Sequence, residues 1–170
     1  MTQKKEVVLD TSVLINFARV GRLDLLRTHP SCSFVVTDHV RGEVSEHYAD
    51  QFAAVDAAIK DGSLQELTVD RPEELRDFGK LTAPRNLGIG ECSAIAVAKN
   101  RSLALAIDDN QARKRAKQFH SKLVLLSTEE LIVSMIKESM LTIEQADQMK
   151  LAWETKHRFK LMFGSFGEKI

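Results

Sequence analysis

The sequence has few cysteines and prolines, no long apolar run and no net charge. Its two cysteines, Cys32 and Cys92, lie far apart along the chain, which excludes a zinc-type cysteine pair and a disulfide framework. Three prolines leave little room for long irregular segments. No apolar run approaches the roughly 18 residues of a membrane span, and the opening MTQKKE lacks the apolar region of a signal peptide. These absences predict a cytoplasmic protein that does not contact a membrane.

The balance of charge limits the kind of partner surface that the chain can present. The 24 basic and 24 acidic side chains cancel at pH 7, which argues against a broad positive surface for nucleic acid. A local basic patch stays compatible with this balance. The 170 residues, of which 44% are hydrophobic, are enough for one globular domain with its own core.

Short apolar runs alternate along the chain with segments of helical character. Five runs are typical of buried strands: 7–9, 33–36, 64–69, 103–107 and 123–126. Helices are expected between and after them at 13–17, 23–26, 44–59, from 72 onward, 89–98, 111–119, and after the capping residues Ser127 and Thr142. This alternation predicts an α/β fold with three layers, in which helices cover both faces of a mostly parallel, five-stranded sheet.

The longest expected helix has a regular apolar stripe. Val44, Tyr48, Phe52, Val55 and Ile59 recur at steps of four, four, three and four residues. This spacing predicts one continuous helix that ends at the following glycine.

Acidic residues gather where the strands of such a sheet would end. Asp10 follows the first strand, Glu43 comes shortly after the second, Glu91 opens a helix after GIG, and Asp108 and Asp109 follow the fourth strand. Ligands of parallel α/β sheets bind beyond the carboxyl ends of the strands. Two adjacent aspartates repel each other unless a metal ion or basic groups offset their charge.

Each acid also has an ordinary structural explanation. Asp10 can cap a helix, Glu91 can complement a helix dipole, Glu43 can be a solvated surface acid, and the aspartate pair can form a turn. Their arrival together at one sheet edge favours a cluster instead. Carboxylates with water are the ligands preferred by hard ions such as Mg²⁺ or Mn²⁺.

Four segments resemble the motifs of the PIN-domain family. VVLDTSVLINFA is similar to its opening motif, and DHVRGEV is similar to its second, which supplies a glutamate. LGIGECSAIAVAKNRSLALAIDDNQARKRA resembles the third and fourth motifs together. Order and spacing match over about residues 6–138. The paired aspartates followed by AR further resemble a prokaryotic PIN-like subgroup related to toxin-type ribonucleases.

The resemblance implies a ribonuclease that hydrolyses RNA phosphodiester bonds with Mg²⁺ or Mn²⁺. It assigns catalysis and metal binding to Asp10, Glu43, Glu91 and Asp109. Asp108 is then an additional acid at the metal, and which of the two aspartates is the ligand stays open. Toxin members more often have Thr-x-Asp at this motif, which aligns their acid with Asp109.

The resemblance also suggests supporting residues and partners. Ser12 and Asn16 would orient a ligand or a water, or else serve the helix start and a polar face. The basic residues expected to meet RNA phosphates, unless they form a solvated helix face, are Arg113, Lys114, Arg115 and Lys117. An antitoxin protein and a homodimer are the implied protein partners. The alternative is a catalytically silent PIN-like module that binds RNA or protein.

Other chemistries fit the sequence less well. A phosphatase with an aspartyl nucleophile needs Asp-x-Asp after the first strand, where Ser12 takes the place of the second aspartate. The GIG segment before Glu91 is not G-x-G-x-x-G, because Ser93 stands where the last glycine belongs.

Two further candidate sites are weak. His39, Glu43 and His47 recur at spacing four and could hold a transition metal, but solvated polar residues explain them more simply. Cys92 is expected to pack in the core and not to act as a nucleophile.

The segment HRFKLMFGSFGEKI, residues 157–170, lies outside the span that resembles the family. It carries Phe159, Phe163 and Phe166, whereas disordered tails are poor in aromatics. We therefore expect a PIN-like domain over 1–156, with the tail packed on this domain or on a homodimer partner. Its two glycines predict a bent segment.

Overall fold

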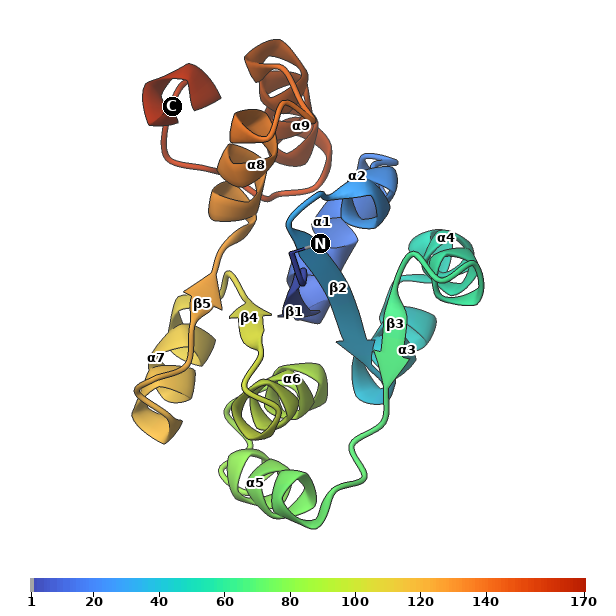
Figure 1. Cartoon of the computed structure of the whole chain (residues 1–170), viewed down its shortest axis with the longest axis vertical. Helices are drawn as coiled ribbons and strands as arrows, with labels where there is room; N and C mark the ends of the chain where they lie inside the picture. The colour runs from blue at the N-terminus through green and yellow to red at the C-terminus, as the bar shows by residue number, and fades with distance from the viewer. Residues whose placement is uncertain (1) are drawn as a thin grey trace.

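A computed structural model, which describes residues 2–170, has a five-stranded parallel sheet at its centre (Figure 1). The strand order is β3-β2-β1-β4-β5, and every neighbouring pair is parallel. The strands are β1 (Lys5–Leu9), β2 (Cys32–Thr37), β3 (Gln65–Leu67), β4 (Ala104–Ala106) and β5 (Leu125–Leu126). The predicted three-layer α/β architecture is confirmed.

Helices connect the strands and cover both faces of the sheet. In chain order they are α1 (Thr11–Arg19), α2 (Asp24–Thr28), α3 (Asp38–His47), α4 (Ala49–Lys60), α5 (Pro72–Thr82), α6 (Ile89–Asn100), α7 (Asn110–Phe119), α8 (Thr128–Lys137), α9 (Ile143–Lys156) and the 3₁₀ turn η1 (Phe166–Lys169). Ser127 and Thr142 cap α8 and α9 through capping boxes, as predicted.

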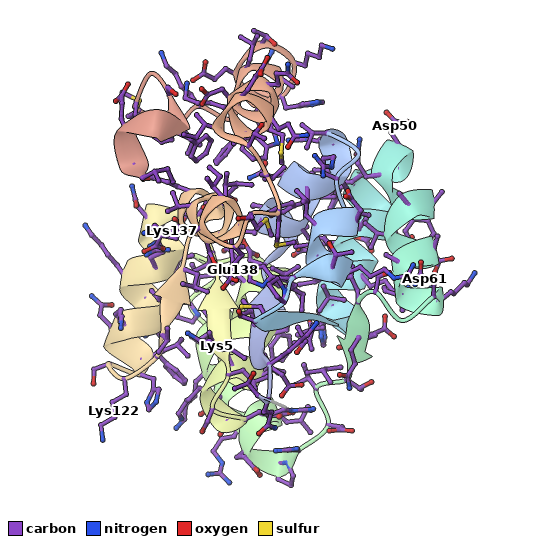
Figure 2. All side chains as sticks on the ribbon, turned by 45° about the horizontal axis from the view of Figure 1, so that its top comes forward. Lys5, Asp50, Asp61, Lys122, Lys137 and Glu138 are labelled. Atoms are coloured by element: carbon purple, nitrogen blue, oxygen red, sulfur yellow. The ribbon has the colours of Figure 1, made fainter. Side chains whose placement is uncertain are left out.

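The central strand shows why the strands are apolar on both sides. Val7 and Leu9 belong to a core shared with α1, α4, α8 and α9, whereas Val8 belongs to a second core shared with α5, α6 and α7. Successive side chains of a strand point to opposite faces, so both sets are buried. Charged side chains project outward instead, as Asp50 and Lys122 do in Figure 2.

The prediction of one continuous helix over 44–59 is wrong in one respect, because the helix is interrupted at Tyr48. This residue has φ −132° and ψ 55° and separates α3 from α4. The apolar stripe still faces one core, since periodicity reports burial and not continuity of the backbone. His47 in the last turn of α3 and Asp50 in the first turn of α4 suit two separate helix dipoles.

The hydrogen-bonded strands are shorter than the apolar runs that predict them. Ile107 and Leu123 are buried in the core but lie outside β4 and β5. An apolar run therefore marks burial, whereas pairing with a neighbouring strand sets the ends of the ladder.

The C-terminal segment lies beside α8 and α9 (Figure 1). Phe166 is fully buried, and Asp147 of α9 accepts hydrogen bonds from the Phe166 amide at 2.8 Å and the Ser165 hydroxyl at 2.6 Å. Phe163 packs edge-on against Phe166, with 4.9 Å between ring centroids. None of the helices formed by residues 2–170 is both long enough and apolar enough to cross a membrane.

Candidate active site

The carboxyl ends of β1 and β4 meet at Asp10. Its backbone amide donates to the Ala106 carbonyl at 3.0 Å, which continues the pairing of the two strands by one step. Because α1 begins at the next residue, Asp10 is held between a central strand and a helix start.

Asp10 is the most constrained acid of the site. Its side chain is buried, with 1% of the residue exposed, and Oδ1 accepts from the Thr11 amide at 2.7 Å. Among residues 2–170, Oδ2 finds no hydrogen-bond partner. Burial, with the neighbouring charges of Glu91, Glu43 and Asp108, raises the pKa of Asp10 to about 8. A buried carboxyl oxygen without a donor, in a field of other carboxylates, is stabilised either by a proton or by a cation.

Glu43 reaches this position from α3 and joins three helices. Its Oε2 accepts from the Thr11 hydroxyl of α1 at 2.7 Å, and its Oε1 accepts from the Gly90 amide of α6 at 2.7 Å. A Cβ at Gly90 would lie 2.6 Å from Glu43 Oε2 and 2.8 Å from Thr11 Oγ1. Only glycine at this position lets the carboxylate approach the helix backbone so closely.

Glu91 lies in the first turn of α6 and closes its capping box. Its Oε2 accepts from the Gly88 amide at 2.9 Å. Partial burial raises the pKa of Glu91, the Gly88 hydrogen bond opposes this, and the charges of Asp109 and Glu43 add to the rise. Glu91 therefore caps a helix and also contributes to the negative field of the site.

The paired aspartates have different surroundings. Asp108 accepts from the Thr128 amide at 2.8 Å, the Thr128 hydroxyl at 2.6 Å and the Asn16 amide group at 3.4 Å. Burial raises the pKa of Asp108 in spite of these donors. Asp109 is exposed, and its Oδ1 caps α7 through the Ala112 amide at 2.8 Å. Asp108 thus ties β4 to α8, while Asp109 faces solvent.

The two supporting residues lie on one wall of an open pocket of about 420 Å³ beside the aspartates. Ser12 is exposed in this pocket. Asn16 is buried and donates to the Thr128 hydroxyl at 3.2 Å as well as to Asp108. Asn16 therefore fixes the side chains of Asp108 and Thr128 relative to each other.

The donor set fits a hard divalent cation by chemistry and charge. Within residues 2–170, however, no group of three or more His, Cys, Asp or Glu side chains is arranged so that it could hold a metal ion. Mg²⁺ is usually bound through only one or two carboxylates and keeps several of its waters. The partnerless Asp10 oxygen suits this mode, with the other acids acting at a distance.

The basic residues of α7 are mostly engaged within the fold. Arg113 donates to the carbonyls of Ile107 and Leu126 at 2.6 and 3.1 Å, which fastens α7 to the strand ends. Lys117 donates to the Leu123 carbonyl at 2.5 Å.

The other two basic residues of α7 have different surroundings. The Arg115 guanidinium lies 5.6 Å from the centre of the Phe119 ring. Lys114 is exposed and lines a separate hollow of about 520 Å³ with Asn110, Arg113, Lys117 and Leu125.

The weaker candidate sites gain no support. His39, Glu43 and His47 line one hollow of about 360 Å³, but no three His, Cys, Asp or Glu side chains among residues 2–170 are arranged to hold a metal ion. His39 packs beside Phe78, with 4.7 Å between ring centroids, and the side chain of His47 is exposed near Glu46. Cys92 is fully buried, and burial raises the pKa of its thiol to about 11. It is a core residue, as expected.

Sequence reasoning missed three residues that hold the acids in place: Thr11, Gly90 and Thr128. Thr11 follows Asp10 directly, and Thr128 follows the Ser127 cap, so both look like ordinary helix-start residues. The GIG segment signals a tight approach of backbone, but nothing in the sequence names Glu43 as the group that approaches.

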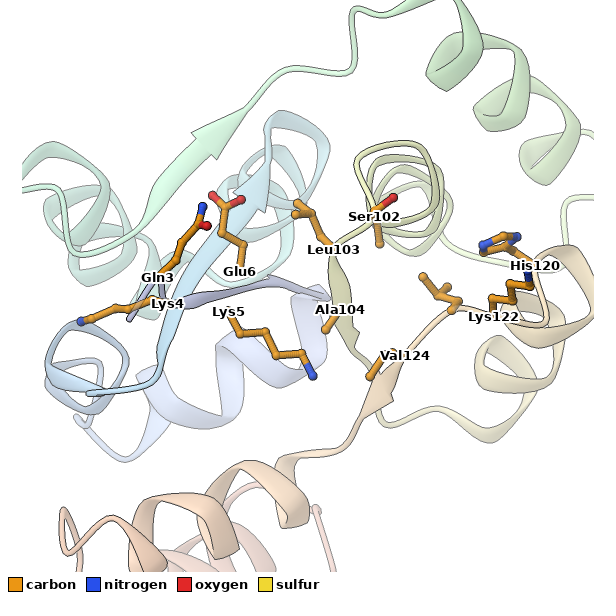
Figure 3. Close-up of a pocket in the computed structure, with 12 residues that line it drawn as sticks. Gln3, Lys4, Lys5, Glu6, Ser102, Leu103, Ala104, His120, Lys122 and Val124 are labelled. Carbon is orange, nitrogen blue, oxygen red and sulfur yellow. The ribbon is translucent and has the colours of Figure 1, made fainter. Parts of the chain in front are cut away.

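A different hollow, of about 480 Å³, lies at the other end of the strands, where β1 and β4 begin (Figure 3). It is lined by residues at the amino ends of β1 and β4, among them Lys5 and Ala104, and by His120 and Lys122. Its place far from the carboxyl edge separates it from the acids.

Residues 6–148 match the family model described as "DUF3368: PIN domain". No curated protein matches the chain.

Comparison with solved structures gives similar folds at low sequence identity. The crystal structure of PAE2754 from Pyrobaculum aerophilum superposes with a TM-score of 0.55 and 18% identity, over 78% of this chain and 90% of that one. VapBC2 from Rickettsia felis bound to a DNA fragment from its promoter (13% identity) and VapBC-1 from nontypeable Haemophilus influenzae (14%) each give a TM-score of 0.49, over 72% of this chain and 98% of theirs.

Proposed function

The chain belongs to the PIN-domain family, and on this basis we propose that it is an endoribonuclease that hydrolyses RNA phosphodiester bonds with Mg²⁺ or Mn²⁺. PIN domains are generally nucleases that use divalent metal ions. The observation that carries the proposal is Asp10, whose buried Oδ2 lacks a hydrogen-bond partner within residues 2–170 and faces the charges of three other acids.

In this proposal Asp10 is the direct ligand, and the remaining acids hold the ion directly or through water. Those acids are Glu43, Glu91, Asp109 and the additional Asp108. When bound, a divalent ion supplies a water of lowered pKa and offsets negative charge on the phosphate. Asp109 is the better candidate of the pair for this contact, since it is exposed and the three donors on Asp108 fix that side chain to Thr128 and Asn16.

The chain's own residues position the reacting groups. Thr11 and Gly90 fix the Glu43 carboxylate, and Thr128 with Asn16 fixes Asp108. The exposed Ser12 hydroxyl lies in the pocket next to these groups, where it can orient a water. On α7, Lys114 and Arg115 are the proposed RNA contacts, because Arg113 and Lys117 donate to backbone carbonyls.

We also propose a cytoplasmic toxin that acts as a homodimer and is held inactive by an antitoxin protein. This part of the proposal follows from the likeness of the motifs to those of toxin-type ribonucleases. Co-expression with the product of the neighbouring gene, followed by co-purification, tests the antitoxin partner.

The central experiment is RNA cleavage by the purified chain with Mn²⁺, with Mg²⁺ and with EDTA. Cleavage is expected only with a divalent ion, and Asp10→Asn is expected to abolish it while the fold is kept. Equal cleavage by the Asp10→Asn variant would exclude Asp10 as the catalytic ligand.

A catalytically silent PIN-like module is the second candidate. It is favoured by the absence, within residues 2–170, of three acids arranged to hold an ion. Such a module would bind RNA or a protein partner without cleaving RNA under any metal condition.

A further inference from the structure

The pocket beside the aspartates has two unlike walls. The acids and their supports form one wall. The other wall comes from Arg19 at the end of α1 and from residues far away in the sequence: Tyr48 between α3 and α4, and His157, Arg158 and Phe159 after α9. At about 420 Å³ the pocket falls in the range of about 300–1,000 Å³ that is usual for ligand sites.

The end of α9 is fixed against the acid site by a buried tryptophan. The Trp153 indole N–H donates to the Asn16 carbonyl at 2.8 Å, and Asn16 in turn donates to Asp108. Phe159 packs edge-on against Trp153, with 5.6 Å between ring centroids. The residues beyond 148, where the family match ends, therefore have a fixed position relative to the acids.

Arg158 occupies the position where the chain turns back after α9. Its φ is 55°, and the next amide, that of Phe159, donates to the Trp153 carbonyl at 3.1 Å. Its side chain is exposed. Neither Arg158 nor Arg19 takes part in an ion pair within residues 2–170. The Arg19 guanidinium lies 5.5 Å from the centre of the Tyr48 ring.

The positive wall continues into a second hollow. This hollow, of about 450 Å³, shares Arg19 and His157 with the first and adds Lys156 and Arg22. Arg22 is paired with Asp24 at 2.9 Å. Arg19, Lys156 and Arg158 thus form a cationic track that leads away from the acids.

We propose that this cationic track binds the backbone phosphates of a single-stranded RNA substrate. Tyr48 and Phe159 line the same pocket and offer faces on which a base can stack. The segment after residue 148 would then be part of the substrate site. This inference rests on the proposed nuclease function.

The cationic track is needed because the RNA backbone and the carboxylates of the site are both negatively charged. A phosphodiester is repelled by a cluster of carboxylates, so its approach needs positive groups close by. The chain as a whole has no net charge and supplies no long-range attraction. Guanidinium groups suit this task, because their planar donors match phosphate oxygens in pairs.

Arg19 and Lys156 also lie in the last turns of their helices, where cations complement the helix dipole. A purely structural role for these two residues must therefore be separated from binding. Arg158 allows this separation, because glycine suits its positive φ and should fold at least as well.

The test measures binding of a labelled single-stranded RNA by fluorescence anisotropy over a range of salt concentrations. All variants carry Asp10→Asn, so that the probe stays intact. Arg158→Gly is expected to weaken binding several-fold, to reduce the slope of log K against log salt by about 0.7, and to leave the melting temperature unchanged or higher. Arg158→Lys should restore the slope, and Arg19→Gln should weaken binding as Arg158→Gly does. Arg76→Gln, an exposed arginine of α5, is the matched control and should bind like the parent.

The proposal is overturned if Arg158→Gly and Arg19→Gln both bind the RNA with the affinity and the salt dependence of the parent. If the unmutated chain still cleaves RNA with Mn²⁺ in that case, only this inference fails and the nuclease stands. If the unmutated chain neither binds nor cleaves RNA, both fail. Tighter binding of single-stranded DNA than of RNA would overturn the substrate class.

Discussion

The Thr11 hydroxyl donates a 2.7 Å hydrogen bond to Oε2 of Glu43 and so links two acids of the site. Thr11 directly follows Asp10, and its backbone amide donates to the Asp10 carboxylate at 2.7 Å. One residue therefore sets the positions of two carboxylates, that of Asp10 at the end of β1 and that of Glu43 in α3. Their separation is a property of the fold and not of the flexible glutamate side chain.

Thr11→Val is expected to release Glu43, since valine keeps the shape of threonine but lacks the hydroxyl donor. A hydrogen bond to a charged group contributes about 1.5–3 kcal/mol, so the free energy of unfolding should fall by this order. RNA cleavage should fall with it, because Glu43 loses its orientation. Chemical denaturation and a cleavage assay measure the two effects. Thr11→Ser keeps the donor and should retain most of both, and equal loss in both variants would contradict the role of the hydroxyl.

Gly90→Ala is expected to displace Glu43 by direct contact. The added Cβ would lie 2.6 Å from Glu43 Oε2 and 2.8 Å from Thr11 Oγ1, closer than real Cβ atoms approach oxygen. Cleavage and melting temperature should both fall. Gly42 of α3 is a matched control, since a Cβ there meets nothing within 4 Å and alanine should stabilise the helix by roughly 0.5–1 kcal/mol. A Gly90→Ala chain as active as Gly42→Ala would show that the close approach has no role.

The contribution of Asp10 to the stability of the metal-free chain is expected to fall as pH rises from about 4 to about 8. Burial and neighbouring acids raise the pKa of Asp10 to about 8, from an unfolded value of 3.8. Between these values the folded chain holds a proton that the unfolded chain has lost, so the free energy of unfolding decreases with pH and levels off above pH 8. Denaturation in EDTA across this range measures the effect, expected to be on the order of a few kcal/mol. Asp10→Asn should remove this part of the pH dependence and be more stable than the parent at pH 8. An identical pH profile in the variant would contradict the assignment.

Divalent ions are expected to reverse this destabilisation. An ion that binds only the folded chain raises the free energy of unfolding by about 2.7 kcal/mol at a hundred times its dissociation constant. Mn²⁺ or Mg²⁺ at millimolar concentration should therefore raise the melting temperature of the parent, and the rise should be larger at pH 8 than at pH 6. Asp10→Asn should show little of it, and calorimetry should detect no binding to that variant. A parent that binds neither ion would refute the metal site.

Much of the fold follows from the sequence because burial leaves a periodic record. Val7, Val8 and Leu9 are apolar in succession because β1 is covered on both faces, and Ser127 marks the start of α8 by its capping box. The break at Tyr48 leaves no such record, because the apolar stripe runs through it unchanged. Periodicity thus reveals which side faces the core but not where the backbone turns.

The site likewise contains residues that a local sequence pattern reveals and contacts that it does not reveal. Asp10, Glu91 and the aspartate pair were recognisable because each follows a strand or opens a helix. Contacts such as Asn16 with Asp108, or Trp153 with Asn16, join residues more than 90 positions apart and depend on how the helices pack. No local pattern encodes them, and the positive wall after α9 belongs to this second class.

Phe166→Ala tests whether the C-terminal segment packs on its own chain. The ring is fully buried in the core that includes Met149 and Trp153 of α9, and its amide is held by Asp147. Removing a buried phenylalanine ring is expected to cost about 3–5 kcal/mol in the free energy of unfolding. Met162, which is 87% exposed, is the control, and Met162→Ala should change stability by no more than about 0.5 kcal/mol.

Light scattering on the same variants decides the role of a second copy. If Phe166 packs within one chain, the loss of stability in Phe166→Ala will be independent of protein concentration, and the mass in solution will match the parent, whether monomer or homodimer. A loss that grows on dilution, with a dimer in the parent and a monomer in Phe166→Ala, would place the ring in an interface instead. A stability equal to that of Met162→Ala would mean that the aromatic tail does not stabilise the domain, because removal of a fully buried ring that packs in a core lowers the free energy of unfolding.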